Sequence, residues 1–188
     1  YRSANGGASW ELHASAKQTG IPRRIGVIAI DPFDSNHIRI GGVRHSNQDS
    51  SGMYVSRDGG VTWARDPFAS AQSYWCHSIV FHPTQQGTIW AAVYERGTRN
   101  GIWRTTNEGG NWTQLTRGLP LPEQFGRASL AVAPSNPNVL YALAEDDRDR
   151  VLGVFRSQDG GGRWRSVGGN HFRRERQMSY NNTIAVHP

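Results

Sequence analysis

The chain has 188 residues and a formal net charge of +6, with 22 glycines, seven tryptophans and one cysteine. A single cysteine excludes a disulfide framework or a thiolate metal site, and no apolar run approaches the ~20 residues that a membrane-spanning helix needs. With 36% hydrophobic residues, the chain has too much core-forming material for a disordered protein. Plentiful Gly, Ser, Thr, Val and aromatic residues favour short strands joined by tight turns.

The positive charge comes almost entirely from arginine, because Lys17 is the only lysine among 21 basic residues. Arginine presents a planar fork that suits carboxylate, sulfate or phosphate groups. The excess of arginine has two possible explanations. It reflects either an arginine-rich overall composition or the binding of an anionic ligand. No nucleic-acid-binding motif is visible, so we expect no nucleic-acid partner.

From its first residues the chain carries an eight-residue box that reads Ser/Thr, any, Asp/Asn, any, Gly, any, any, Trp. Internal repeats of this kind decide the fold before any other pattern does. The box occurs four times, and its tryptophans are 53, 49 and 52 residues apart. Its defined positions are occupied by Ser3, Asn5, Gly7 and Trp10, by Ser56, Asp58, Gly60 and Trp63, by Thr105, Asn107, Gly109 and Trp112, and by Ser157, Asp159, Gly161 and Trp164.

A second marker has the same period. An alternating apolar segment ends in proline at Pro32, Pro83, Pro134 and Pro188, in steps of 51, 51 and 54 residues. Two independent markers therefore define one repeating unit of about 50 residues. In the unit that is easiest to interpret, strands are predicted at 77–82, 88–94, 101–105 and 111–115, with turn residues between them.

Taken in chain order, the units form one all-β segment. Residues 1–13 supply strands three and four of a first unit, complete units cover about 24–67, 77–116 and 127–168, and 182–188 begin a further one. Four-stranded antiparallel units of this length are the blades of β-propellers. We therefore predict three complete blades and two partial ones, cut from a larger ring and lying in a single domain segment, 1–188.

The chemistry of the box is that of a turn. An Asp or Asn side chain accepts backbone N–H bonds across a tight corner, the glycines allow positive φ, and the tryptophan is expected to pack between sheets. Asn5 and Asn107 occupy the position that Asp58 and Asp159 fill elsewhere. A position that accepts a neutral amide does not depend on charge, so we predict a structural role for the box, with its Asp–Gly turn between strands three and four.

The box resembles the Asp-box, or bacterial neuraminidase (BNR) repeat, of sialidases, sortilin-type receptors, xyloglucan-specific endoglucanases and photosystem II assembly factors. The segments 118–120, 132–142 and 154–161 resemble the sortilin-like and xyloglucanase-like glycosyl hydrolase branch. This resemblance implies a β-propeller in a secreted or periplasmic protein. It does not extend to the sialidase Arg-Ile-Pro strand, because residues 21–24 read Ile-Pro-Arg-Arg, nor to the Cys-rich module that follows sortilins.

Function is expected on one face of the propeller. Boxes and proline-marked turns share one face, whereas the longer connections between strands two and three and between blades share the other, which we call the top face. About five of the six net positive charges fall on these top-face connections. Such a face would steer an anionic ligand. The top-face connections are approximately 14–24, 44–52, 67–76, 95–100, 116–127, 145–152 and 168–181.

Nine top-face residues are candidates for ligand binding. Trp75, with His77 beside it, is expected to stack on a sugar ring or on a peptide side chain. The acidic run around Asp147 and Asp149 offers carboxylates for acid–base chemistry. The seven histidines lack metal-ligand spacing, so neither a metal nor a cofactor is expected, and no catalytic residue is assigned. The full set is Arg44, Asp49, Trp75, His77, Arg96, Glu123, Asp147, Asp149 and Arg174.

The leading functional hypothesis is a non-catalytic propeller of the sortilin-like type, which binds an anionic, peptide or glycan ligand on its arginine-rich top face. Its expected partners are a protein, peptide or glycan ligand and the remaining blades of the propeller. One alternative is a glycoside hydrolase related to xyloglucan-specific endoglucanases, which requires two carboxylates across a cleft. The other is an assembly factor that resembles the photosystem II type.

Overall fold

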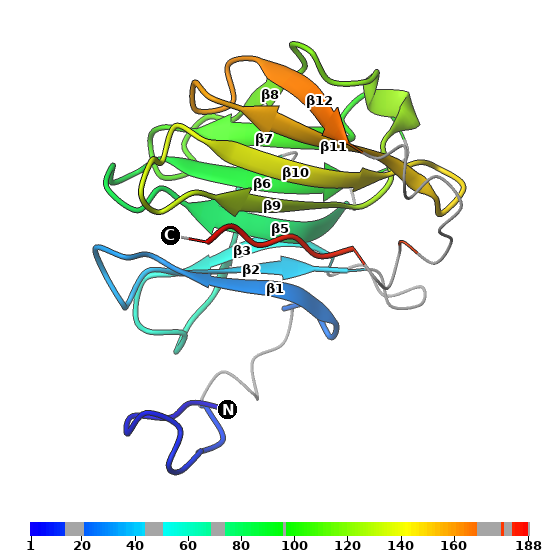
Figure 1. Ribbon diagram of the computed structural model, residues 1–188. Helices are drawn as coiled ribbons and strands as arrows, with labels where there is room; N and C mark the ends of the chain where they lie inside the picture. Colours follow the sequence, from blue (N-terminus) through cyan, green and yellow to red (C-terminus); the bar gives the residue numbers. More distant parts are fainter. Residues whose placement is uncertain are drawn as a thin grey trace.

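The computed structural model describes residues 1–13, 21–43, 51–68, 74–95, 97–168, 178 and 182–187. Within these residues the chain forms three four-stranded antiparallel sheets, and each sheet contains four strands that are consecutive in sequence (Figure 1). The predicted all-β class, with four-stranded antiparallel units, is confirmed. A 3₁₀ turn, η2 at Pro122–Gln124, lies in the connection between the second and third sheets.

The strands follow the chain without crossovers. The first sheet contains β1 (Ile25–Ile30), β2 (Ile38–Gly42), β3 (Gly52–Ser56) and β4 (Ala64–Arg65). The second contains β5 (Trp75–Phe81), β6 (Ile89–Tyr94), β7 (Gly101–Thr105) and β8 (Thr113–Leu115). The third contains β9 (Ala128–Val132), β10 (Leu140–Glu145), β11 (Val151–Ser157) and β12 (Trp164–Gly168). In the second sheet, strand three has the predicted bounds, and the other strands differ from prediction by two residues or fewer at each end.

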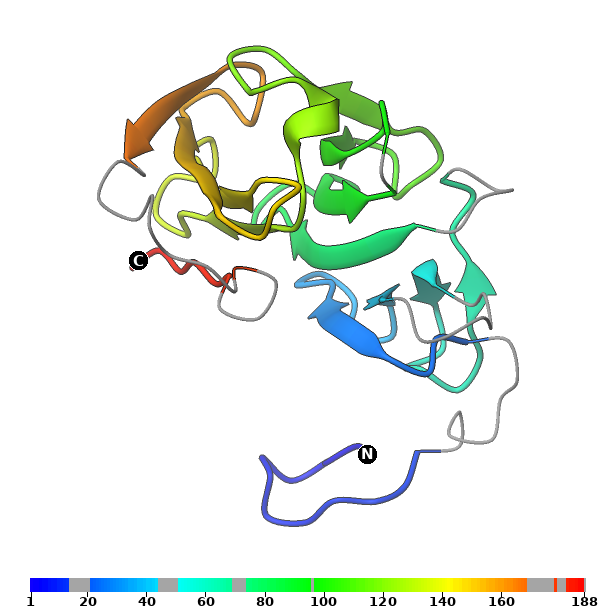
Figure 2. The ribbon, with the colours of Figure 1, turned by 90° about the vertical axis from the view of Figure 1, so that its right-hand side faces the viewer.

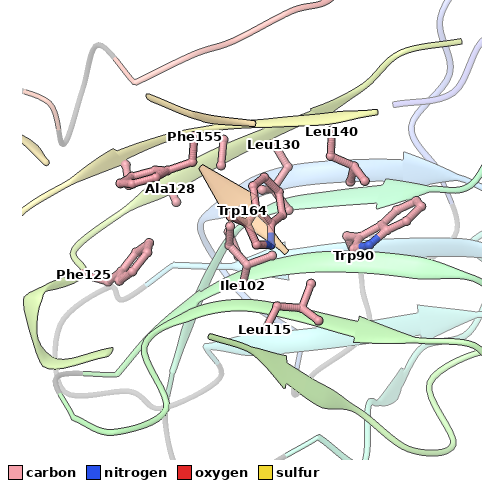
Figure 3. Close-up of a cluster of buried hydrophobic side chains, with 12 residues drawn as sticks. Trp90, Ile102, Leu115, Phe125, Ala128, Leu130, Leu140, Phe155 and Trp164 are labelled. Carbon is pink, nitrogen blue, oxygen red and sulfur yellow. The ribbon is translucent and has the colours of Figure 1, made fainter. Parts of the chain in front are cut away.

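Strand β6 shows how the sheets pack on one another. Its side chains alternate between the two faces of the sheet, as the period of a strand requires. Trp90 lies in the core between the second and third sheets (Figure 3), together with Ala92. Ile89, Ala91 and Val93 lie in the core between the first and second sheets. The central sheet is therefore covered on both faces, and Figure 2 shows the three sheets fanned side by side.

The first strand of each sheet lies at the inner edge of the fan. Strand β5 contacts β1 and β2 on one side and β9 on the other. One hydrogen bond links β5 and β9 directly, from the Leu130 amide to Ser78 Oγ at 3.1 Å. Because inner strands carry the top-face connections at their N-terminal ends, those ends gather around the position that the axis of a propeller would occupy.

All four boxes fold into the same hydrogen-bonded turn. In the second box, Asp58 Oδ1 accepts from the Thr62 amide at 2.8 Å and from Ser56 Oγ at 2.7 Å. In the third box, Asn107 Oδ1 accepts the equivalent bonds from the Asn111 amide and Thr105 Oγ1, both at 2.9 Å. The amide and the carboxylate therefore make the same contacts, and the turn does not require charge.

Two consecutive residues of each box have positive φ. In the first, second and fourth boxes both residues are glycines. In the third box the first of the two is Glu108 (φ 56°), which is followed by Gly109 (φ 89°). A left-handed conformation costs a non-glycine residue about 1–2 kcal/mol. Glu108 recovers part of this cost through its side chain, which forms an ion pair with Arg57 at 3.0 Å.

The box tryptophans are buried to very different extents, so the expectation that all four pack between sheets was wrong. Trp164 is 2% exposed and packs on the second sheet with Ile102 and Leu115, whereas Trp10 is 63% exposed. Each box tryptophan packs on the blade before its own. No earlier blade among the described residues covers Trp10. The blade of Trp63 is preceded only by the short hairpin that the Arg2–Glu11 bridge closes, and Trp63 is half-buried.

Residues 182–188 were predicted as the first strand of a further blade, and the described part of this range, residues 182–187, lies outside the three sheets. They lie extended beside β9, where Ser129 Oγ donates to the Asn182 carbonyl at 2.7 Å (Figure 1). The first strand of a blade pairs with the second strand of the same blade, and the described residues place no second strand beside this segment.

Candidate functional site

A polar cavity of about 540 Å³ opens at the inner edge of the fan, at the N-terminal ends of the inner strands. It lies on the top face as defined from the sequence. Its walls come from all three sheets and from the extended C-terminal segment. The lining residues are Gly26, His77, Ser78, Arg127, Ser129, Leu130, Asn182, Thr183 and Ile184.

Three of the lining residues occupy equivalent positions in successive repeats. Gly26, His77 and Asn182 each lie six positions before the proline that ends their repeat marker, whereas Arg127 lies seven positions before Pro134. The cavity therefore gathers the same point of three repeats, and Arg127 joins it from one residue earlier in the remaining repeat. The same count, made on the sequence, would have brought Asn182 into the candidate set beside His77.

His77 is the candidate residue with the most unusual environment. Burial, with a smaller contribution from the positive charge of Arg127, lowers its pKa to about 4, so the ring is neutral at pH 7. Its Nε2 atom is buried and has no hydrogen-bond partner among the described residues. The Trp75 ring lies 6.0 Å from the imidazole in an edge-to-face arrangement and also contacts Tyr94 at 5.2 Å.

Arg127 connects the cavity to a buried carboxyl group. The Arg127 amide donates to Glu145 Oε1 at 2.7 Å, and the Glu145 amide donates back to the Arg127 carbonyl at 2.9 Å. Burial raises the pKa of Glu145 to about 7, and Asp149 and Asp146 add to the rise while Arg127 opposes it. Gly126 leaves the space for this carboxyl, because a Cβ there would lie 2.6 Å from Glu145 Cγ.

Asn182 closes the other side of the cavity and is 2% exposed. Its Nδ2 donates to the Arg127 carbonyl at 3.1 Å, which fixes the orientation of the amide. Its Oδ1 is buried and has no hydrogen-bond partner in the part of the chain that the structure describes. Two of the residues that line the cavity, His77 and Asn182, thus each carry a buried polar atom whose hydrogen-bonding capacity is unused among the described residues.

The nine candidates from the sequence do not gather into one site. Arg44, Asp49, Arg96 and Arg174 lie outside the described residues. Of the other five, only Trp75 and His77 come together in the structure. Glu123 is exposed on η2, Asp147 is exposed at the tip of the β10–β11 hairpin, and Asp149 has φ 65° in the turn of the same hairpin.

A second cavity, of about 310 Å³, lies between the first and second sheets near the third box. Phe68, Trp103 and Trp112 form its aromatic wall, and Arg99 and Asn111 add polar groups. Phe68 packs edge-to-face on both tryptophans, with ring centroids 4.7 Å and 5.9 Å apart. Neither cavity is lined by a carboxylate from the described residues.

No three His, Cys, Asp or Glu side chains among the described residues are placed to hold a metal ion. No described helix is long and apolar enough to cross a membrane. Cys76 is fully buried in the core between the first and second sheets, and burial raises the pKa of its thiol well above the usual range.

Comparison with known proteins identifies what the chain is similar to. Residues 54–65 match the BNR/Asp-box repeat family. Over 165 residues, 86% of the chain, the sequence is 31% identical to a xyloglucanase of Paenibacillus sp. The chain spans only 14% of the length of that enzyme.

Solved structures show the same fold. An ancestral GH74 enzyme superposes with a TM-score of 0.60 at 23% identity, covering 79% of this chain and 19% of the enzyme. A YCF48 protein bound to a D1 peptide superposes with a TM-score of 0.52 at 22% identity, covering 76% of this chain and 40% of that protein. Both are β-propeller proteins, so the predicted Asp-box propeller fold is confirmed.

The leading functional hypothesis, a non-catalytic ligand-binding propeller of the sortilin-like type, was wrong. Relatives that match 86% of this chain are named as xyloglucanases, which are hydrolases and not non-catalytic binding proteins. The sequence could not make this distinction because the box and its neighbouring strands build the scaffold, and scaffold residues are shared by binding and catalytic propellers alike.

Proposed function

We propose that the chain is part of the propeller of a glycoside hydrolase that acts on xyloglucan. The observation that carries the proposal is the 31% identity to a xyloglucanase over 86% of this chain. That similarity continues across all three blades instead of being confined to the boxes, which propellers of other functions also contain. The proposal concerns the whole protein to which these blades belong.

An uncovered face of β1 supports a larger ring. Val27 and Ala29 on one face of β1 pack into the core with the second sheet. On the other side Ile25, Ile28 and Ile30 are 46%, 63% and 57% exposed. Apolar residues on both faces are typical of a strand that is covered on both sides. Further blades of the same protein would cover the exposed isoleucines.

Hydrolysis of a glycosidic bond needs two carboxyl groups, about 5–5.5 Å apart for a retaining reaction or roughly 6.5–9.5 Å apart for an inverting one. Asp147 and Asp149 lie on one hairpin, and no cleft among the described residues separates them from a second acid. Glu145 has the raised pKa of a general acid, but its Oε1 is held by the Arg127 amide and its Oε2 is buried. We therefore place the catalytic pair outside the described residues.

The test is hydrolysis by the protein in its full natural length. Purified protein is incubated with xyloglucan, and new reducing ends are measured over time, with unbranched cellulose and xylan as comparison substrates. The proposal predicts steady release from xyloglucan and much slower release from the unbranched chains. Release from none of these polysaccharides, by a folded protein, would contradict it.

A further inference from the structure

We propose that the cavity at the inner edge of the fan binds a neutral sugar ring, with His77 and Asn182 as its hydrogen-bonding residues. The choice of a sugar rests on the proposed function, but the site is separate from the catalytic pair. It lies where the inner strands of successive blades meet, and it contains no carboxylate among its described lining residues.

The first argument is the unused hydrogen-bonding capacity. A buried polar atom without a partner costs about 1–3 kcal/mol, so folded proteins seldom contain two of them in one cavity unless a ligand or water completes their bonds. His77 Nε2 and Asn182 Oδ1 are such atoms. Asn182 is 2% exposed, and its orientation is fixed by the bond from Nδ2 to the Arg127 carbonyl.

The second argument selects the chemical class of the ligand. Asn182 Oδ1 is an acceptor and must receive a hydrogen bond, whereas a neutral imidazole offers one donor and one acceptor. A hydroxyl group both donates and accepts, so it satisfies either atom. A carboxylate has no hydrogen to give Asn182, and a metal cation would be repelled by the neighbouring Arg127. Adjacent hydroxyls on a sugar ring fit this arrangement best.

Charge and size agree with that choice. Arg127 lies beside Glu145, whose carboxyl carries negative charge above a pKa of about 7, so the positive charge on this wall is opposed from behind. The volume of about 540 Å³ is within the usual range of small-molecule sites, roughly 300–1,000 Å³. Ser78 and Ser129 add hydroxyl groups to the wall.

The experiment uses the full-length protein and titrates it with glucose, with xylose and with a xyloglucan oligosaccharide, followed by calorimetry. His77→Leu and Asn182→Ala should weaken sugar binding about tenfold or more, because each leaves ligand hydroxyls unpaired in a dry site. His77→Gln, which keeps a polar atom near the Nε2 position, should stay within about threefold of the natural protein. Asn138→Ala, on an exposed turn away from the cavity, is the matched control and should change nothing.

A second measurement does not depend on the variants folding. In the natural protein, saturating sugar should shift the ¹⁵N resonance of His77 Nε2, whereas acetate at equal concentration should not. Two results would overturn the inference. The first is sugar binding that is unaffected in the folded variants His77→Leu and Asn182→Ala. The second is a shift of the His77 Nε2 resonance that is larger with acetate than with sugar.

The hydrolysis assay separates this inference from the proposed function. Xyloglucan cleavage without any His77-dependent sugar binding would remove only the cavity site. Sugar binding that depends on His77 and Asn182, in a protein that cleaves no polysaccharide, would support the site and remove only the hydrolase assignment.

Discussion

Arg39 and Trp90 occupy equivalent positions in β2 and β6, and each donates a hydrogen bond to a backbone carbonyl in the box of the blade that follows. Arg39 Nη2 donates to the Glu108 carbonyl at 2.6 Å, and Trp90 Nε1 donates to the Gly160 carbonyl at 3.1 Å. The accepting residue is the fourth of the box in both cases. Asp-box turns therefore serve two purposes, because they close a hairpin and dock their blade on the one before.

Arg39 also forms the ion pair that should matter most for stability. It contacts Asp66, and both side chains are 1% exposed or less. Removing one partner of a buried pair leaves an uncompensated charge, at a cost of about 3–5 kcal/mol. Arg39→Met should therefore lower the free energy of unfolding by that amount, measured by urea denaturation, and adding Asp66→Asn should recover part of the loss.

The matched control for Arg39 is the exposed pair between Arg57 and Glu108, whose side chains are 59% and 34% exposed. Exposed pairs contribute roughly 0–1 kcal/mol, so Arg57→Met should have little effect on unfolding. Similar costs for Arg39→Met and Arg57→Met would show that the buried pair contributes no more to stability than an exposed one.

The four box tryptophans should differ in importance as their burial does. Trp164→Ala removes a side chain that is 2% exposed between two sheets, and we expect a loss of about 3–5 kcal/mol. Trp10→Ala removes one that is 63% exposed and should cost well under about 1 kcal/mol within this chain. Thermal unfolding of both variants tests this order, and equal destabilisation would refute it.

The acidic residue of the second box gives an acid-sensitivity prediction. Hydrogen bonds from the Thr62 side chain and backbone, together with one from Ser56, lower the pKa of Asp58 to about 2. Its folded pKa is below its unfolded value, so its stabilisation is present above about pH 4 and disappears as the pH falls toward 2. Asp58→Asn should leave the melting temperature at pH 7 almost unchanged, because Asn107 makes the same bonds.

Asp58→Ala is the comparison for that variant, because alanine removes the acceptor altogether and should lower the melting temperature clearly. The natural protein should lose stability between pH 4 and pH 2 more steeply than Asp58→Asn does. If the asparagine variant unfolds as readily as the alanine variant at pH 7, the turn depends on charge and the hydrogen-bond account is incorrect.

Glu145 gives the opposite pH dependence. Burial raises its pKa to about 7, above its unfolded value, so its contribution to stability is full below about pH 4.5 and declines as the pH rises through 7. Glu145→Gln keeps an acceptor for the Arg127 amide and cannot ionise. At pH 8 it should be more stable than the natural protein by about 1–3 kcal/mol, whereas at pH 5 the two should be close.

Melting curves at pH 5, 6, 7 and 8 measure this difference directly, with Asp147→Asn as a control because Asp147 is exposed. A constant difference between Glu145→Gln and the natural protein across the four values would mean that Glu145 does not titrate in this interval.

Local patterns in the sequence were sufficient for the fold. The boxes and the proline markers repeat with one period, and strand β7, Gly101–Thr105, was predicted residue for residue. Contacts between blades were not predicted, because they depend on how units about 50 residues apart are placed in space. Arg39 Nη2 and the Glu108 carbonyl are joined across 69 positions, and no pattern in either segment indicates the other.

The residues of the candidate cavity were likewise predicted only where a local pattern indicated them. His77 was a candidate because it stands beside Trp75 in an aromatic cluster, whereas Arg127 and Asn182 were missed because each appears ordinary in its own loop. Asn182 shares with His77 its spacing before the repeat proline, whereas Arg127 is connected to them only by the convergence of the inner strands, which the structure shows. The exposure of Trp10 was missed because the box pattern specifies the tryptophan but not the blade that receives it.

If these blades belong to a xyloglucan hydrolase, as we propose, the full-length protein should release reducing ends from xyloglucan. We predict release that continues linearly with time and is proportional to enzyme concentration. A folded protein that releases no reducing ends from xyloglucan would contradict the claim.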